Sequence, residues 1–222
     1  NRTKIIATVG PGCDDESVMQ SLVDGGVSCF RINLSHGTEG QKRHYFNLVK
    51  SLKTPSGLRP SVLADIAGPK IRVKDLKDKI NVKRGESVVL SNAKSNQNAV
   101  SISKGVRFEK VNPGARILIN DGRLSLEVKE LLSNQTIDCV AINDGSIENG
   151  KGVNFPGIAL NVPVLTTQDE IDLNLSLSEE ADWLALSFVR SPSDYQFIKD
   201  KINDAGYDIP IIAKIEKWEA VQ

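Results

Sequence analysis

Apolar residues in the first third of the chain follow two alternating patterns. Short runs rich in β-branched residues predict strands, and longer stretches with apolar residues three and four positions apart predict amphipathic helices. The predicted strands span residues 4–9, 29–34 and 62–66, and the predicted helices span residues 14–23 and the stretch after a capping box of Thr38 and Gln41. Strands that alternate with helices at this spacing indicate a parallel sheet or a β/α barrel.

Between residues 73 and 155 the pattern changes. Short alternating segments, such as residues 87–90 and 116–119, are separated by Asn-Pro-Gly, Asp-Gly and Arg-Gly turns. Closely spaced strands with turn residues between them predict a small all-β domain.

The β/α pattern then resumes. Thr167 and Glu170 predict another capping box, Ser191-Pro192 predicts the start of a helix that ends at Gly206, and strands are expected over residues 183–189 and 209–215. The β/α series thus contains five strands, whereas a closed barrel of this class needs eight. We therefore predict an α/β fold, a partial (β/α)8 TIM barrel interrupted by a small all-β barrel-like domain. The predicted domains are 1–72 (first part of the barrel), 73–155 (inserted all-β domain) and 156–222 (barrel continuation, truncated).

Composition narrows the functional classes. The 28 basic and 28 acidic residues cancel, so the chain has no overall positive field for nucleic acid or for an anionic membrane, and any anion site must be local. The cysteines, Cys13, Cys29 and Cys139, fit neither a disulfide framework nor a CxxC metal site. No apolar run is long enough to span a membrane. We therefore expect a cytoplasmic protein.

Polar residues occur where the predicted strands end. Arg31, Asn33 and Ser35 alternate along one strand, so they share one face, and His36 follows them. Active sites of β/α barrels lie at the carboxyl ends of the strands. A half-exposed antiparallel strand would show the same alternation, but the surrounding β/α pattern argues against it.

Three other segments carry charged residues in suggestive places. Asp65 ends a strand and lies close in sequence to Lys70 and Arg72, an arrangement that a charged connector into the next domain would also show. Lys151 lies among glycines, which is compatible with a phosphate contact or with an ordinary hinge between domains. The spacing of a P-loop is absent. Lys214 and Glu216 lie two residues apart at a strand end and so face the same way. Such a pair is compatible with enolate stabilisation beside a metal-binding carboxylate, or with a structural ion pair.

Taken together, these segments resemble pyruvate kinase. The motifs KIIATVGP, FRINLSHG, ADIAGPKIR, KGVNFPG, LTTQDEIDL, LALSFVR and IIAKIE occur here in the order found in that family, and the resemblance covers essentially the whole chain. It implies that the all-β domain is the lid that these kinases carry between barrel strands three and four. It also implies phosphoryl transfer from phosphoenolpyruvate to ADP, giving pyruvate and ATP.

The resemblance implies roles for individual residues. Arg31, Arg72 and Lys214 correspond to catalytic residues near the transferring phosphoryl group, with Arg31, Ser187 and Lys214 binding substrate. Glu216 corresponds to a ligand of Mg²⁺ or Mn²⁺, and the aspartate that completes this metal site is expected beyond Gln222. The implied nucleotide-binding residues are Asn33, His36 and Lys151, and the implied ligands of a monovalent cation are Asn33, Ser35 and Asp65.

Several positions depart from the commoner family pattern. Lys70 stands where potassium-dependent members carry glutamate, so the resemblance implies that K⁺ is not required. Ile66 and Ala67 replace a threonine and a lysine, and Lys217 and Ala220 replace an asparagine and a glycine.

The implied partners are phosphoenolpyruvate and ADP or ATP, with neither nucleic acid nor membrane, and the full-length parent is expected to be a homotetramer. The 222-residue chain alone is expected to be inactive. Two alternatives stay open, which are another phosphoenolpyruvate-handling β/α barrel such as an aldolase or synthase, and a truncated non-catalytic relative that acts as an interaction module.

Overall fold

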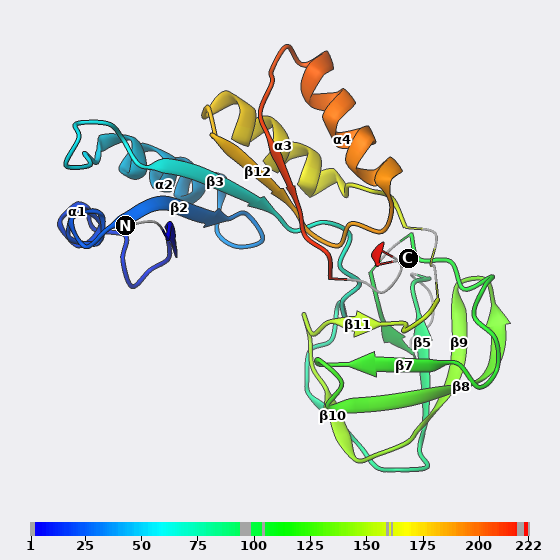
Figure 1. Cartoon of the computed structure of the whole chain (residues 1–222). Coiled ribbons are helices and arrows are strands. Elements are labelled where there is room, and N and C mark those ends of the chain that lie inside the picture. The colour runs from blue at the N-terminus through cyan, green and yellow to red at the C-terminus, as the bar shows by residue number, and fades with distance from the viewer. Residues whose placement is uncertain are drawn as a thin grey trace. The chain divides into compact units, whose positions relative to one another are not determined.

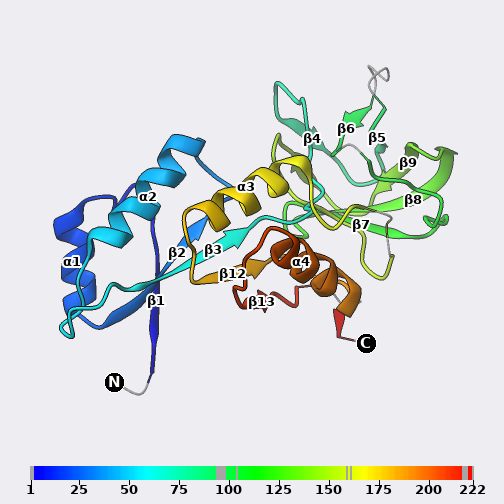
Figure 2. The ribbon, with the colours of Figure 1, turned by 90° about the horizontal axis from the view of Figure 1, so that it is seen from above.

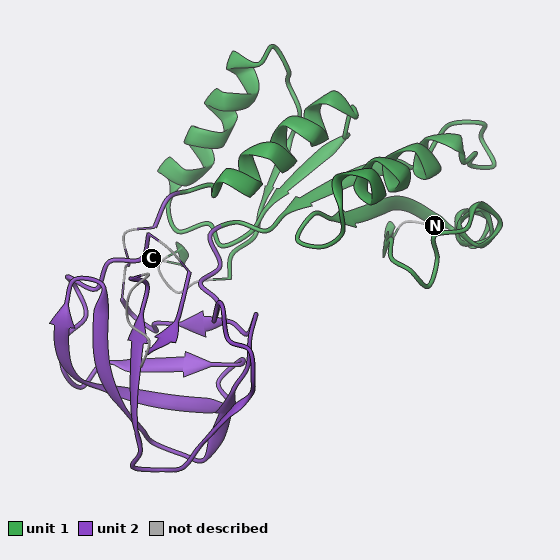
Figure 3. Ribbon diagram, turned by 180° about the vertical axis from the view of Figure 1, so that it is seen from behind, with its two compact units in different colours: residues 1–68, 164–221 green, residues 69–163, 222 purple. Residues whose placement is uncertain are grey.

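The chain divides into two compact units. The computed structural model describes residues 3–93, 99–103, 105–158, 160, 162–216 and 220–221. Unit 1 comprises Asn1–Gly68 and Val164–Val221, and unit 2 comprises Pro69–Pro163 (Figure 3). Unit 2 begins before the predicted boundary at residue 73 and ends after the predicted one at residue 155. The reason is that Ile71 and Leu160 are both buried in the core of unit 2.

Unit 1 is built on a parallel sheet whose strand order is β1-β2-β3-β12-β13 (Figure 1, with all five strands labelled in Figure 2). Its strands are β1 (Ile5–Thr8), β2 (Val27–Asn33), β3 (Ser61–Ile66), β12 (Trp183–Leu186) and β13 (Ile211–Ala213). All neighbouring strands pair in parallel. The structure therefore confirms the five strands of the predicted β/α series, and it pairs β3 directly with β12 although all of unit 2 separates them in sequence.

Four helices cover one face of this sheet (Figure 2). They are α1 (Glu16–Asp24), α2 (Glu39–Ser51), α3 (Thr167–Ser178) and α4 (Pro192–Asp204). Ile32 and Leu34 of the β2 segment belong to the core between sheet and helices, together with Met19 of α1 and Phe46 of α2. Because strand residues alternate, Arg31 lies on the opposite face, as predicted.

The helix caps confirm one prediction and correct another. Thr38 and Gln41 form the expected capping box of α2. The box of α3 is formed by Thr166 and Asp169, so the prediction of Thr167 and Glu170 was wrong by one residue. Two consecutive threonines and an Asp-Glu pair fit either register, and tertiary burial decides between them because Asp169 is only 1% exposed.

The last two strands are shorter than predicted. β12 ends at Leu186 instead of residue 189, and β13 covers Ile211–Ala213 instead of residues 209–215. Phe188 adopts a left-handed backbone conformation with φ of 57°, which is incompatible with an extended strand. The apolar run continues past the point where the strand turns.

Ion pairs join α2 to α3 across the two sequence-distant parts of unit 1. Lys42 Nζ lies 2.6 Å from Asp172 Oδ1, and both side chains are buried. Glu179, which follows α3, accepts hydrogen bonds from Arg43 and Lys50 of α2. A buried pair needs both partners, because removing one leaves an uncompensated charge.

Unit 2 is all β, as predicted. A six-stranded sheet has the order β11-β7-β8-β9-β5-β6, and β10 pairs with β4. The strands are β4 (Ile80–Val82), β5 (Ser87–Ser91), β6 (Val100–Ser101), β7 (Arg116–Ile119), β8 (Leu124–Ser133), β9 (Thr136–Ala141), β10 (Gly145–Ile147) and β11 (Val153–Asn154). They enclose a hydrophobic core of their own.

The three cysteines are free thiols. Cys139 lies in the core of unit 2, where burial raises its pKa to about 12, so its thiol is protonated and unreactive at neutral pH. Within the described part of the chain, no helix combines the length and apolar character that crossing a bilayer requires.

Candidate active site

Polar side chains of unit 1 gather where the parallel strands end. Asn33 of β2 pairs with Asp65 of β3, and Asp65 pairs with Ala185 of β12. Leu186 of β12 in turn pairs with Ala213 of β13, so Ser187 and Lys214 follow at the same edge. The carboxyl ends of parallel strands thus bring together residues that lie far apart in sequence.

Asp65 is at the centre of this cluster. Its carboxylate accepts hydrogen bonds from Arg31 Nε at 2.7 Å and from Lys214 Nζ at 3.2 Å to each oxygen. Ser187 Oγ donates to the same carboxylate and accepts from Lys214 Nζ at 2.8 Å. The Asp65 side chain is only 3% exposed, so two cations and a hydroxyl compensate a carboxylate that is removed from water.

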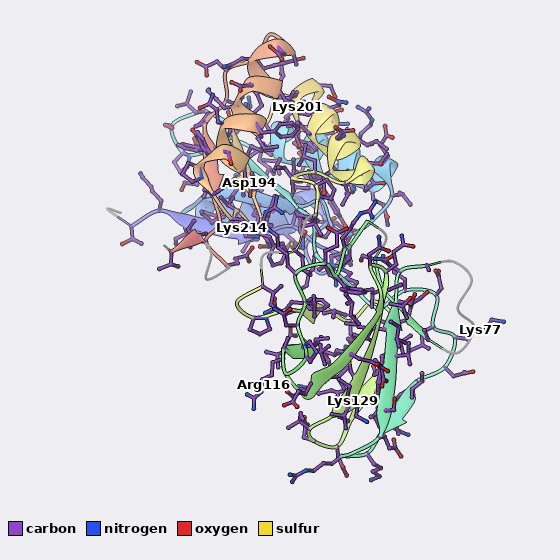
Figure 4. The ribbon with its side chains drawn as sticks, turned by 90° about the vertical axis from the view of Figure 1, so that its right-hand side faces the viewer. Lys77, Arg116, Lys129, Asp194, Lys201 and Lys214 are labelled. Atoms are coloured by element: carbon purple, nitrogen blue, oxygen red, sulfur yellow. The ribbon has the colours of Figure 1, made fainter. Side chains whose placement is uncertain are left out.

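The two cations remain partly accessible. The side chains of Arg31 and Lys214 are 30% and 29% exposed, and Figure 4 labels Lys214 at the end of the β13 segment. Arg31 is fixed further by a hydrogen bond from its guanidinium to Thr8 Oγ1 at 3.1 Å. A buried anion therefore orients two cations whose outer surfaces are free to contact an anionic ligand.

Glu216 lies beside this cluster. Its Oε1 is 3.8 Å from Lys214 Nζ, which confirms that the two side chains face the same way. Its Oε2 accepts the backbone N–H of Phe188 at 3.1 Å, at the residue whose backbone is left-handed. This backbone contact was not predicted, because the apolar run around Phe188 gives no sign of a turn.

Glu216 by itself is an incomplete metal site. Divalent magnesium takes six oxygen ligands, some of them water. Among the described residues there is no group of three or more His, Cys, Asp or Glu side chains that could hold a metal ion. Glu216 is thus one suitable carboxylate ligand, and the rest of a protein ligand set is not found in the described part of the chain.

The residues after β2 form a tight turn. Asn33 Oδ1 accepts the backbone N–H of Ser35 at 3.1 Å, and the N–H of Leu34 donates to the carbonyl of Asp65. Ser35 and His36 are exposed. Asn33 and Asp65 are thus neighbours, but the carboxylate of Asp65 is already engaged by cations.

Three predicted residues lie together in unit 2. Val73 N–H donates to the carbonyl of Lys151, and the Arg72 guanidinium donates to the carbonyl of Gly150 at 2.9 Å. The stem of Lys70 lies against Gly152, where a Cβ would come within 3.0 Å of Lys70 Cε. The segments that carry Lys70, Arg72 and Lys151 are therefore paired, and glycine at position 152 leaves room for the lysine.

Sequence reasoning missed two residues that contact the sheet edge or the segment after it. Thr8, at the end of β1, contacts Arg31. The rule that active sites lie at the carboxyl ends of the strands, which drew attention to Arg31, would also have identified this threonine. Asp169, on α3, accepts the N–H of Gly68, and no local pattern connects residues so far apart. Of the unusual family positions, Ile66 is buried at the end of β3, whereas Lys217 lies outside the described residues.

Comparisons with known proteins point to one family. The family model "Pyruvate kinase, barrel domain" matches residues 1–222. The chain is 38% identical to pyruvate kinase 2 of Synechocystis sp. and 34% identical to pyruvate kinase of Clostridium perfringens, covering 100% and 99% of this chain. It also resembles the crystal structure of a pyruvate kinase from Cryptosporidium parvum, with a TM-score of 0.85 and 29% identity, covering 98% of this chain and 46% of that one. The chain spans only 38% and 47% of the length of the two curated relatives.

Proposed function

The chain belongs to the pyruvate kinase family, and from this premise we propose that the whole protein transfers the phosphoryl group of phosphoenolpyruvate to ADP, giving pyruvate and ATP. The observation that best supports this proposal is the cluster of Arg31, Asp65, Ser187 and Lys214 at the carboxyl edge of the sheet. Two oriented, partly exposed cations suit a substrate with a phosphate and a carboxylate. Family membership argues against the alternative of an aldolase or synthase.

In this proposal the cations stabilise negative charge as it develops. Lys214 faces the forming enolate and the phosphoryl oxygens, and Arg31 and Arg72 contact the transferring group. Ser187 orients Lys214 through the 2.8 Å hydrogen bond between them. Because Asp65 holds Arg31 and Lys214 in place before substrate arrives, little reorganisation accompanies the reaction. Asn33, His36 and Lys151 serve the nucleotide.

The family implies a divalent cation, Mg²⁺ or Mn²⁺, with Glu216 as one ligand. Such an ion neutralises charge on phosphoryl oxygens. We assign no step to it, because the described residues supply only part of a ligand set. We further propose that Lys70 supplies the positive charge that K⁺ provides in other members, so the monovalent site of Asn33, Ser35 and Asp65 is not needed.

The setting follows from the same premise. We propose that the enzyme works in the cytoplasm as a homotetramer, with phosphoenolpyruvate and adenine nucleotides as partners and with neither nucleic acid nor a membrane. The charge balance of 28 basic and 28 acidic residues gives no overall attraction to polyanions.

The test is a coupled assay of pyruvate formation by the purified full-length protein, with Mg²⁺ or Mn²⁺, phosphoenolpyruvate and ADP. We expect turnover by the full-length protein and none by the 222-residue chain. A full-length protein that folds but forms no pyruvate with either metal would refute the proposal and favour the non-catalytic interaction module.

A further inference from the structure

Asp169 is a buried carboxylate that has no part in the proposed chemistry. Its side chain is 1% exposed, and it lies in the first turn of α3, on the helical layer of unit 1. No ion pair with a lysine, arginine or histidine accompanies it among the described residues. The helix N-terminus favours a negative charge at this position, but this alone does not explain the contacts of both oxygens.

The two carboxylate oxygens of Asp169 bind different segments. Oδ2 accepts the backbone N–H of Thr166 at 2.8 Å, which forms the capping box together with the bond from Asp169 N–H to Thr166 Oγ1 at 3.2 Å, and Oδ2 also accepts the Thr166 hydroxyl at 2.7 Å. Oδ1 accepts the backbone N–H of Gly68 at 3.1 Å, although Gly68 is 101 positions away. Gly68 is the last residue of unit 1 before the first connection to unit 2, and Thr166 follows soon after the return at Val164. One side chain therefore fixes both connections where they join unit 1.

Gly68 is also held from its other side. A Cβ at this position would lie 2.5 Å from the carbonyl oxygen of Ser187, and φ of Gly68 is +66°. Only glycine fits such a close approach in a left-handed conformation. The backbone is thus confined between Asp169 of α3 and Ser187, which follows β12.

This confinement acts on the candidate active site through short links. Asp65 precedes Gly68 by three residues, and the Ser187 hydroxyl contacts both the Asp65 carboxylate and Lys214 Nζ. If Gly68 moved, the segment after β3 and the Ser187 backbone would lose the contact that sets their separation. Transition-state stabilisation by a fixed cation depends on such preorganisation.

We propose that Asp169 is a positioning residue for the phosphoryl-transfer site, because its bond to Gly68 N–H fixes the segment that links Asp65 to unit 2. The inference rests on the proposed function. An asparagine cannot replace this carboxylate: it offers one oxygen, so its NH₂ group must face either Gly68 N–H or Thr166 N–H, and two donors then oppose each other.

The test compares Asp169→Asn with Thr166→Ala in the full-length protein. Thr166→Ala removes the hydroxyl of the same capping box but keeps both backbone N–H groups that Asp169 accepts. We expect kcat to fall about tenfold in Asp169→Asn while KM for phosphoenolpyruvate stays within about threefold, because the lost interaction acts in the transition state. In Thr166→Ala we expect a lower thermal midpoint and kcat within about twofold of the unmodified protein.

Amide hydrogen exchange gives a second readout that does not depend on activity. In the unmodified protein the Gly68 amide should exchange as slowly as the amides of β3, and at least about tenfold faster in Asp169→Asn than in Thr166→Ala. If Asp169→Asn does not fold, the exchange rate in the unmodified protein still tests whether the Gly68 amide is held in a hydrogen bond.

Three results would overturn the inference: an unmodified Gly68 amide that exchanges as fast as exposed loop amides, an Asp169→Asn variant with unchanged kcat, or equal losses of kcat in the two variants. An unmodified protein without turnover would instead refute the proposed function, and the exchange rates would still show whether Asp169 holds Gly68.

Discussion

At the scale of single residues, the candidate site depends on how one carboxylate is shared. Asp65 contacts Arg31 and Lys214 at once, and its burial gives these contacts their strength. Lys214 also contacts Ser187 and lies near Glu216, so its ammonium group has a fixed position. The side chain proposed to stabilise the enolate is therefore held by three neighbouring side chains.

We expect Lys214→Ala to abolish phosphoryl transfer by the full-length protein while leaving the fold largely intact. Arg31 remains to compensate Asp65, so the buried carboxylate keeps one cation. A steady-state assay together with circular dichroism measures both effects. Lys201→Ala is the matched control, because Lys201 (labelled in Figure 4) also forms an ion pair, with Glu170 at 3.1 Å, but both side chains of this pair are exposed. A loss below about tenfold, or about 1.4 kcal/mol, in Lys214→Ala would show that its role is misassigned.

Lys70 leads to a prediction about salts. In buffer free of potassium and ammonium ions, the unmodified full-length enzyme should be fully active, because the lysine ammonium supplies the positive charge. In Lys70→Glu the added negative charge should make turnover dependent on K⁺, and a potassium titration of kcat in both proteins would measure this. A requirement for potassium in the unmodified enzyme would contradict the assignment.

Sequence patterns located these residues but not their contacts. The alternation along β2 and the position of strand ends identified Arg31, Asp65 and Lys214 as polar residues on or near strand ends, and the structure brings the three into contact. The pattern associated Asp65 with Lys70 and Arg72, its neighbours in sequence, whereas its contacts in unit 1 are with Arg31 and Lys214. Partners across a sheet depend on strand register and order, which spacing along one chain does not specify.

At the scale of elements, the existence of helices and strands was predictable and their ends were less so. Hydrophobic periodicity identified the strands of the parallel sheet and the helices that cover it. The predicted capping register of α3 was wrong because the tertiary contact of Asp169 decides it. The predicted end of β12 was wrong because the chain turns at Phe188. A local pattern gives several acceptable boundaries, and packing selects one of them.

The junction of α2 and α3 should make stability depend on pH. Partial burial raises the pKa of Glu179, but hydrogen bonds from Lys50 and Arg43 outweigh it and hold this pKa below its ordinary value of 4.5. A lowered folded-state pKa contributes stability above pH 4.5, and this contribution is lost as the pH falls through the folded-state value.

We therefore expect Glu179→Gln to lower the stability of the protein by about 1 kcal/mol at pH 7. The difference in stability between the variant and the unmodified protein should shrink as the pH falls below 4.5, the ordinary pKa of a glutamate. Thermal denaturation followed by circular dichroism over a series of acidic buffers measures this. Glu180→Gln is a suitable control, because no ion pair of that neighbouring residue is found in the described part of the chain. A difference that does not change with pH would mean that the carboxylate charge is not what stabilises the junction.

At the scale of the whole molecule, the two units differ in how the chain forms them. Unit 2 is one continuous segment with its own hydrophobic core, whereas unit 1 is assembled from two segments on either side of it. The contacts that join the halves of unit 1 include the pairing of β3 with β12 and the buried pair of Lys42 and Asp172.

We expect a protein of residues 69–163 to fold alone, since its core, among the residues that the structure describes, contains none from unit 1. A dispersed amide NMR spectrum and a cooperative thermal transition would show this. A protein of residues 1–68 is the comparison, and it should not fold, because β3 lacks its neighbour β12 and the helix α2 lacks the partner of Lys42. A collapsed, poorly dispersed spectrum of residues 69–163 would contradict the expectation.

The pairing of β3 with β12 also affects the order of events on the ribosome. During synthesis, β3 emerges long before its neighbour β12, so the first half of unit 1 cannot complete its sheet until unit 2 has been translated. Unit 2 can fold in that interval, and its folding replaces a long flexible loop between β3 and β12 with a compact body. Closing a loop costs entropy that grows with the logarithm of its flexible length, so each residue ordered in unit 2 reduces the cost of joining the two strands. The inserted domain thus lowers the entropic cost of completing the sheet that it interrupts.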